Sequence, residues 1–372
     1  MKTLRVAVDG RHLHVGKATG GGQLLEDSLR AISAHSSQLD VVTFFEALGR
    51  LGAGSRIFGR PSALLADLVL KHSWIPLWMR WAKADAQLSF LPPCSFVSSG
   101  IPRIAYILDV PETLESAGFE QGLYNRLYIG KTARVAEHIV TISEFSRQRI
   151  LSMLQVSADR VSVVYPCTDL KVFRPHTAEE IGTARRSMGL PERYVLGVCS
   201  KMTNRKNPGA YLEAYRRLSP DLRADVPLVM VGAAKELNDF APFVDAGVVG
   251  EVASSVRVLG SVGRAELAAL YAGSACVLFP SRYEGFGLPV IEAAACGAPV
   301  IAGDIPAIGE AAGEVATLVA PDDHDRLGSE LEKILGEEIQ ASEREKSIRW
   351  GCSFSEERFA TDIERLILKV CN

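Results

Sequence analysis

The sequence lacks the features that mark several classes of protein. Its net charge is only −3 over 372 residues, so no basic field points to a nucleic-acid partner. Its seven cysteines are odd in number and have no metal-site spacing, which predicts reduced, mostly buried thiols in the cytosol. No window approaches about 18 uninterrupted apolar residues, and the opening MKTLRVAVDGRHL predicts a strand and a turn, not a signal peptide. We therefore expect a cytoplasmic protein without a membrane span.

What the sequence does have is a regular alternation of apolar strands and amphipathic helices. This length predicts about two domains, and a hydrophobic content of 47% supports large cores. The expected strands are Leu4–Val8, Val41–Phe45, Ala86–Phe90, Ile104–Leu108, His138–Thr141, Val161–Val164, Tyr194–Val198, Leu228–Val231, Val256–Leu259, Ala275–Phe279, Pro299–Ala302 and Ala316–Val319. The expected helices are Gln23–Ala34, one capped by Ser143, Pro208–Leu218, Arg264–Ala272, Asp323–Leu335 and a last one from about Ser355 to Val370. Such alternation predicts mainly parallel sheets covered by helices on both faces.

The strands fall into two series, separated by a segment of turn composition at Tyr165–Pro175. We interpret this segment as a hinge and predict an α/β fold of two doubly wound, Rossmann-like domains, residues 1–170 and 171–354. Ligands of open α/β sheets bind beyond the carboxyl ends of the strands, so two such domains are expected to face each other across a cleft.

The stretch Pro280–Asp304, PSRYEGFGLPVIEAAACGAPVIAGD, combines a glycine-rich turn with two carboxylates, Glu284 and Glu292. Pro289 suits the first position of a helix and Gly297 suits the left-handed residue that ends it. A helix N-terminus with glycines before it is an anion site. Carboxylates beside an anion site, with Glu292 in the first helical turn, are placed to accept hydrogen bonds from hydroxyls. The pattern favours a nucleotide sugar, although an ordinary strand–turn–helix connection explains it too.

Two further segments are candidates for binding phosphate. The loop CSKMTNRKNPGAY offers the cations Lys201, Arg205 and Lys206, which would stabilise a leaving diphosphate. Gly20–Gly22 end a loop that starts at His12 and open the helix from Gln23, so their N–H groups are also candidates. The alternatives are a basic surface loop for the first segment and a plain glycine-rich loop for the second.

Pro280–Asp304 closely resembles the donor-binding motif of family 4 glycosyltransferases, which are retaining enzymes of the GT-B fold. The resemblance covers nearly the whole chain and is more specific in the C-terminal half. It implies that Glu284 binds sugar hydroxyls, that Glu292 binds the ribose and that Lys206 contacts the phosphates, with Lys201 or Arg205 as a second cation. The implied donor-binding residues are Lys201, Arg205, Val262, Gly285, Phe286, Gly287, Leu288, Glu292, Gly21 and Gly22. It also implies that the last helix, within 355–372, crosses back to pack on the first domain.

One position departs from the family. Where relatives carry His-Asp at the end of a strand in the first domain, this chain has Leu108 and Asp109 within PRIAYILDVPETL. A leucine cannot hydrogen-bond a sugar hydroxyl. Three alternatives remain: Asp109, His12 or His14 takes over the orientation of the sugar, the donor sugar differs at that hydroxyl, or activity is lost.

Trp74, Trp78 and Trp81 fall on one face of an expected helix, with no counterpart in the family. They predict packing against the core of the first domain or an acceptor wall; the alternative is an interfacial helix that contacts a membrane.

The sequence thus predicts an enzyme, a retaining glycosyltransferase that moves a hexosyl group from a nucleotide sugar to a saccharide or lipid-linked acceptor. Resemblance to bacterial mannosyl- and rhamnosyltransferases of polysaccharide assembly favours a GDP-mannose-like donor. Glu284, Lys206 and Asp109 are the expected catalytic residues, and we expect no cofactor, no metal and no nucleic acid. Peripheral contact with the inner face of a membrane is an open possibility, and the oligomeric state is not predicted. The alternatives are a GT-B sugar-nucleotide epimerase and a non-catalytic protein that binds nucleotide sugars.

Overall fold

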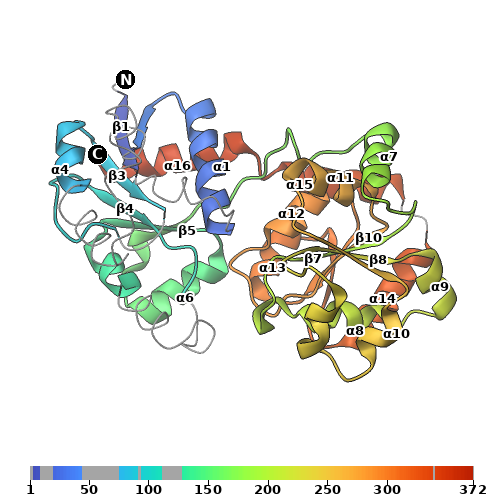
Figure 1. Cartoon of the computed structure of the whole chain (residues 1–372). Coiled ribbons are helices and arrows are strands. Elements are labelled where there is room, and N and C mark those ends of the chain that lie inside the picture. The colour runs from blue at the N-terminus through green and yellow to red at the C-terminus, as the bar shows by residue number, and fades with distance from the viewer. Residues whose placement is uncertain are drawn as a thin grey trace, which may run out of the picture. The chain divides into compact units, whose positions relative to one another are not determined.

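The chain forms two units, and each contains one sheet (Figure 1). A computed structural model describes residues 3–8, 20–43, 75–90, 94–110, 128–337 and 340–371. One unit comprises Met1–Cys167 with Ser355–Asn372, and the other comprises Thr168–Phe354. The division at Cys167 falls inside the expected hinge segment, which has a turn composition.

The first unit has a six-stranded parallel sheet in the order β2-β1-β3-β4-β5-β6. Its strands are β1 (Leu4–Val8), β2 (Leu39–Thr43), β3 (Ala86–Ser89), β4 (Arg103–Tyr106), β5 (His138–Thr141) and β6 (Val161–Val163). Val6 of β1 pairs with Val41 on one side and with Ala86 on the other. The inner strands are almost continuously buried, as expected for a parallel sheet with helices on both faces.

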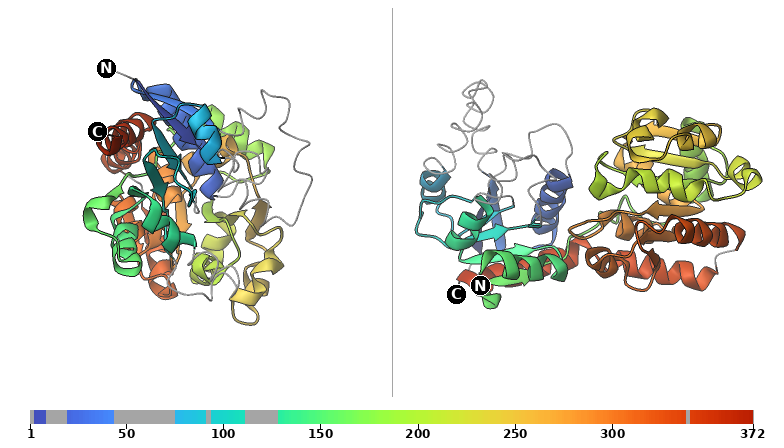
Figure 2. Two further views of the ribbon diagram at one scale, coloured as in Figure 1. Left: turned by 90° about the vertical axis from the view of Figure 1, so that its left-hand side faces the viewer. Right: turned by 90° about the horizontal axis from the view of Figure 1, so that it is seen from below.

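The helices of this unit are α1 (Gly20–His35), α4 (Ile75–Trp81), α6 (Glu144–Leu154) and α16 (Glu356–Cys371), and residues 128–135 are also helical. Ser143 caps α6 as predicted, because its hydroxyl accepts the N–H of Ser146 at 3.0 Å. Although α16 comes last in the sequence, it packs against α1, and Figure 2 shows it in dark red beside the blue elements. Its stripe of Phe359, Ile363 and Ile367 is buried there.

The second unit repeats the architecture with the order β12-β11-β10-β7-β8-β9, again all parallel. Its strands are β7 (Val195–Cys199), β8 (Leu228–Gly232), β9 (Val256–Gly260), β10 (Cys276–Phe279), β11 (Val300–Gly303) and β12 (Ala316–Val319). The predicted fold class is therefore confirmed. Each expected strand is present, with ends that differ by at most two residues, the usual uncertainty of such boundaries.

The helices of the second unit are α7 (Ala178–Ser187), α8 (Pro208–Tyr215), α9 (Pro220–Asp225), α10 (Val248–Val252), α11 (Arg264–Gly273), α12 (Leu288–Ala295), α13 (Pro306–Ala312), α14 (His324–Gly336) and α15 (Ala341–Cys352). Short 3₁₀ turns lie at Asn204–Lys206, Leu237–Phe243 and, in the first unit, Ala158–Arg160. The helix from Pro208 ends three residues earlier than predicted, at Tyr215. The N–H groups of Arg217 and Leu218 instead reach carbonyls three residues back, those of Ala214 and Tyr215, so the chain tightens into turns there.

One helix that the sequence did not predict supports α12 directly. α15 packs on α12, and Gly351 is the point of closest approach, since a Cβ there would lie 2.3 Å from the backbone nitrogen of Ala295. Gly297, with a φ of 77°, ends α12 in the left-handed conformation that was predicted for it.

The tryptophans of α4 do not share one environment. Trp74 lies outside the described residues. Trp78 packs against the cluster that contains Ile75 and Met79, whereas Trp81 is 74% exposed. The predicted packing against the core is therefore confirmed for Trp78 and wrong for Trp81. No helix among the described residues combines the length and apolar character needed to cross a membrane.

The reactivity of the cysteines tests whether the two cores are packed as described. Five are buried, and only Cys352 and Cys371 are half-buried. Burial raises the pKa of Cys94 and Cys199 to about 11, and that of Cys167 and Cys276 to about 12. At pH 8 we expect iodoacetamide to label Cys352 and Cys371 first, because the thiolate is the reactive form and needs access. Peptide mapping by mass spectrometry checks this, with the denatured chain as control. Early labelling of Cys199 or Cys276 in the folded protein would contradict the packing described.

Candidate active site

A buried ion pair lies at the carboxyl edge of the sheet in the second unit. The ammonium of Lys206 is 2.5 Å from Oε1 of Glu284, and the two side chains are only 11% and 10% exposed. The same ammonium lies 5.7 Å from the ring centroid of Phe279, the last residue of β10. Removing two charges from water is costly, so a pair kept this dry has a reason beyond stability.

Adjacent strands bring the two charges together. Lys206 ends the 3₁₀ turn that follows β7, and Glu284 lies in the loop after β10, the strand that pairs with β7. The carbonyl of Arg205 accepts the backbone N–H groups of Arg282 and Tyr283, at 3.0 and 3.3 Å. The loops are thus joined through their backbones as well as through the ion pair.

The glycine-rich turn leads from Glu284 into α12 as the sequence suggested, with two corrections. Gly287 is the N-cap with a φ of 123°, and a Cβ there would approach that of Ala311 to 3.3 Å. The helix begins at Leu288, so Pro289 takes the second position and not the first. Glu292 then lies in the second turn and not in the first, because the helix starts no earlier than its glycine cap allows. Phe286 is buried and packs edge-on against Phe354, with ring centroids 5.5 Å apart.

Glu292 has a neighbour that the sequence did not indicate. The hydroxyl of Tyr271, from α11, lies 3.4 Å from Oε2 of this half-buried carboxylate. Burial first, and the charge of Glu292 second, raise the pKa of Tyr271 far above its usual range, so the phenol stays protonated and donates. The contact restrains the carboxylate on the exposed side of α12.

Tyr271→Phe should therefore weaken binding of a nucleoside diphosphate about two- to fivefold, because a long hydrogen bond of this kind is worth about 0.5–1 kcal/mol. Isothermal titration calorimetry measures the change. Tyr215→Phe is the matched control, since its buried hydroxyl bonds the carbonyls of Arg223 and Val226, away from Glu292. Equal losses of affinity in both variants would show that the contact with Glu292 has no specific role.

The other predicted residues of this unit lie around the same edge. Lys201 is exposed, two residues beyond β7, and Arg205 is half-buried with its guanidinium 5.6 Å from the ring centroid of Tyr283. Val262 is half-buried and follows β9, just before α11. The sequence motif therefore folds into one local arrangement at the loops after β7 and β10, with Val262 two strands further along the sheet.

Three predicted residues belong to the first unit. Asp109 is half-buried in the segment after β4, and Leu108 packs partly against the apolar cluster of the sheet. The prediction that Gly21 and Gly22 end a loop is wrong, because α1 begins at Gly20 and both glycines lie in its first turn. First-turn N–H groups have no partner inside a helix, and a helix N-terminus is the kind of position that binds an anion. His12 and His14 lie outside the described residues.

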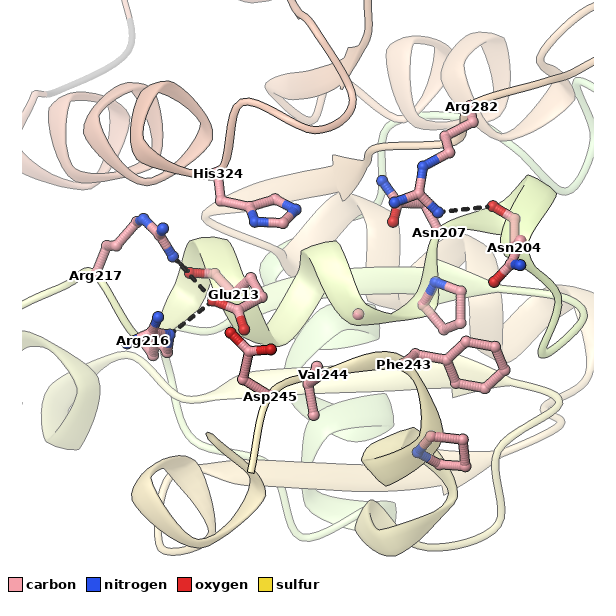
Figure 3. A pocket seen from close by; sticks show the side chains of 13 residues that line it. Asn204, Asn207, Glu213, Arg216, Arg217, Phe243, Val244, Asp245, Arg282 and His324 are labelled. Carbon is pink, nitrogen blue, oxygen red and sulfur yellow. Dashed lines mark hydrogen bonds and ion pairs between the residues drawn. The ribbon is translucent and has the colours of Figure 1, made fainter. Parts of the chain in front are cut away.

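A cavity of about 470 Å³ lies next to the loop after β7 but is not lined by the predicted site residues (Figure 3). Asn204, Asn207 and Arg282 line one end. At the other end Glu213 receives the guanidinium groups of Arg216 and Arg217, at 2.7 and 3.1 Å. These arginines are already neutralised by a carboxylate, so the cavity carries no argument for an anion. Within the described residues, no group of three or more histidine, cysteine or acidic side chains is placed to hold a metal ion.

Sequence reasoning missed two residues of this region, Asn207 and Tyr271. Asn207 stands directly after Lys206 in the RKN segment, so its position in that motif was an available signal. Tyr271 had none, because its relation to Glu292 depends on how α11 packs against α12.

Comparison with known proteins agrees with this geometry. Residues 193–337 match the family described as glycosyl transferases group 1. The O-antigen chain mannosyltransferase B of Escherichia coli is 29% identical over 197 residues, which is 53% of this chain and 51% of that protein. The D-inositol 3-phosphate glycosyltransferase of Salinispora arenicola (strain CNS-205) is 26% identical over 308 residues, 78% of this chain and 66% of the relative. The chain thus spans about half to two thirds of the length of these curated relatives.

Among solved structures, Anabaena Alr3699/HepE in complex with UDP-glucose superimposes with a TM-score of 0.73 at 17% identity, over 98% of this chain and 99% of that one. WaaG, a glycosyltransferase involved in lipopolysaccharide biosynthesis, gives a TM-score of 0.62 at 16% identity, over 95% of both chains. The two units with parallel six-stranded sheets are therefore the GT-B fold. Residues 193–337 thus match the group 1 glycosyltransferases, and both units together have the fold of these solved structures.

Proposed function

We propose that this chain is a retaining glycosyltransferase that moves a hexosyl group from a nucleotide-diphosphate sugar to a saccharide or lipid-linked saccharide acceptor. The observation that carries the proposal is the buried Lys206–Glu284 pair. Its carboxylate belongs to a residue three positions before Gly287, the N-cap of α12. A mannosyl donor such as GDP-mannose is favoured by the name of the Escherichia coli relative, with a rhamnosyl donor as the nearest variant. The UDP-glucose complex of the Anabaena protein makes UDP sugars the other group to test.

The Lys206–Glu284 pair has hydrogen-bonding groups left over to bind a nucleotide sugar. An ammonium has three N–H donors and a carboxylate has two acceptor oxygens. Among the described residues, Lys206 donates one of its N–H groups, to Oε1 of Glu284. In the proposal the remaining N–H groups of Lys206 bind phosphate oxygens, and Oε2 of Glu284 accepts a hydroxyl of the sugar. One pair thereby orients both sides of the bond that breaks.

The reaction needs charge stabilisation at the leaving diphosphate. The bond between the anomeric carbon and the phosphate oxygen breaks, and the acceptor oxygen bonds the same face of that carbon. The acceptor proton passes to the departing phosphate oxygen. Lys206 and the N-terminus of α12 carry the developing charge, with Lys201 or Arg205 as a second cation. The backbone N–H groups of Phe286, Gly287 and Leu288 line the sugar, Glu292 binds the ribose, and Val262 meets the base through its backbone. In the first unit, Asp109, Gly21 and Gly22 are the residues that we propose for the acceptor and for further contacts to the donor.

A thermal-shift screen with GDP, UDP, dTDP and ADP tests which nucleotide the donor site binds. A ligand at one hundred times its Kd adds about 2.7 kcal/mol to the free energy of unfolding, so the matching base should raise Tm clearly above the others. Nucleotide release from GDP-mannose or UDP-glucose is then followed with and without acceptor oligosaccharides. Release that depends on acceptor is the expected result. Conversion of the donor to another sugar nucleotide without acceptor would instead identify an epimerase, and binding without turnover would identify a binding protein.

Contact with a membrane surface is part of the same proposal, because a lipid-linked acceptor would lie there. Leu77 and Trp81 on α4 are 65% and 74% exposed, with the exposed Arg80 and Lys83 beside them. Co-sedimentation with anionic phosphatidylglycerol vesicles should decrease in Leu77→Ser/Trp81→Ser. Unchanged sedimentation of this variant would exclude α4 as the contact.

A further inference from the structure

We propose that Asn207 is a positioning residue that holds the Lys206–Glu284 pair in place by joining three loops at the carboxyl edge of the sheet. This inference rests on the proposed function, in which that pair binds the donor. It assigns a role to a residue that does not need to touch the donor itself.

Asn207 is built into the structure in an unusual way. It is 2% exposed and adopts the left-handed conformation, with φ 49° and ψ 55°, between the 3₁₀ turn Asn204–Lys206 and α8. Asparagine tolerates this conformation better than most residues. Although Asn207 occupies the N-cap position of α8, its side chain makes no capping bond. The amide is therefore used for something other than ending or starting a helix.

The amide of Asn207 connects loops that are far apart in sequence. Its Nδ2 donates to the carbonyl of Pro280 at 3.1 Å and to that of Pro321 at 2.8 Å. Pro280 follows β10 and begins the segment that carries Glu284, and Pro321 lies beyond β12. One buried side chain thus binds the loops after β10 and β12 to the loop after β7.

Arg282 strengthens the same junction from the outside. Its guanidinium donates to the carbonyl of Asn204 at 3.1 Å (Figure 3). The guanidinium also pairs with Asp322 at 2.6 Å. Its backbone N–H is one of the two that donate to the carbonyl of Arg205. Asp322 directly follows Pro321, so the arginine and Asn207 clamp the same three loops.

The junction matters because Lys206 and Glu284 lie within it. Lys206 is the residue immediately before Asn207, and Glu284 is four residues beyond Pro280. A small displacement of a group that contacts the reacting centre can lower a rate by two orders of magnitude. The ammonium of a flexible lysine stays in one place only if the backbone of that lysine is fixed. The hydrogen bonds of Asn207 fix the backbone next to Lys206.

Asn207→Gly tests this role alone, because glycine keeps the left-handed conformation but removes every hydrogen bond that the amide donates, including a long one of 3.5 Å to Asp322. The readout is the preference for a nucleoside diphosphate over the monophosphate, which reports the charge that Lys206 places on the second phosphate. We expect Lys206→Met to lower the GDP-over-GMP affinity ratio at least tenfold and Asn207→Gly to lower it at least fivefold. UDP and UMP are measured in parallel, and the pair with the tighter diphosphate is used.

The double variant decides between positioning and general stability. In the Lys206→Met background, Asn207→Gly should leave the ratio unchanged, since there is no ammonium left to misplace. If Asn207→Gly lowers the ratio by the same factor in both backgrounds, the inference is overturned while the role of Lys206 stands. If Lys206→Met itself leaves the ratio unchanged, the proposed role of Lys206 and this inference both fail.

Two further variants complete the experiment: a replacement for Asn207→Gly and a matched control. Asn207→Ser has a short side chain that cannot donate to both carbonyls and adds no buried charge, and it replaces the glycine variant if that one does not fold. Asn204→Ala is the matched control, an exposed asparagine of the same turn whose backbone carbonyl is the group that binds Arg282. The affinity ratio of this control should equal that of the parent chain, and a comparable loss there would overturn the specific role of Asn207.

Discussion

Lys206→Met is expected to lower the rate of hexosyl transfer by about 100- to 1,000-fold, as the loss of one stabilising donor does at other sites where charge develops. The same change should reduce the free energy of unfolding by about 3 kcal/mol. The reason is that it leaves Glu284, only 10% exposed, as an uncompensated buried charge. Steady-state kinetics and chemical denaturation measure the two effects separately.

The double variant Lys206→Met/Glu284→Gln separates stability from catalysis. It removes both charges, so we expect it to recover most of the stability lost in Lys206→Met. Its transfer rate should stay as low as that of the single variant, because neither the diphosphate nor the sugar is then held. Lys346→Met is the matched control, since it breaks a Lys–Glu pair in which both side chains are exposed, with the ammonium of Lys346 2.8 Å from Oε2 of Glu314. Recovery of activity along with stability would contradict a catalytic role for the pair.

Glu292→Ala is expected to weaken binding of the nucleoside diphosphate about 10- to 100-fold. Hydrogen bonds to a charged group are worth about 1.5–3 kcal/mol, and in the proposed site this carboxylate accepts the hydroxyls of the ribose. Calorimetry with GDP and UDP measures the loss.

A nucleotide without those hydroxyls provides the internal test. The parent chain should bind the ribonucleotide at least tenfold more tightly than its 2′,3′-dideoxy analogue, and Glu292→Ala should bind the two equally. Glu332→Ala, an exposed glutamate of α14, is the control and should keep the preference. Retention of the preference in Glu292→Ala would mean that the ribose lies elsewhere.

The fold was largely predictable because its signals are local. The strands are short apolar runs that a parallel sheet buries on both faces, and they can be recognised within four or five residues. Helix boundaries were less predictable where packing decides them. α13 and α15 have weak patterns of their own, and α15 is stabilised by the close contact of Gly351 with α12.

The site divides in the same way. The sequence itself determines the glycine-rich turn, the helix after it, the left-handed Gly297 and the presence of Glu284, Glu292 and Lys206, since each belongs to a contiguous pattern. The tertiary structure decided that Lys206 and Glu284, 78 positions apart, form one buried pair, that Tyr271 reaches Glu292, and that Asn207 joins three loops. The physical reason is that these contacts depend on which strands are neighbours in the sheet. The pairing of β7 with β10 depends on the packing of the whole unit, and no local pattern encodes it.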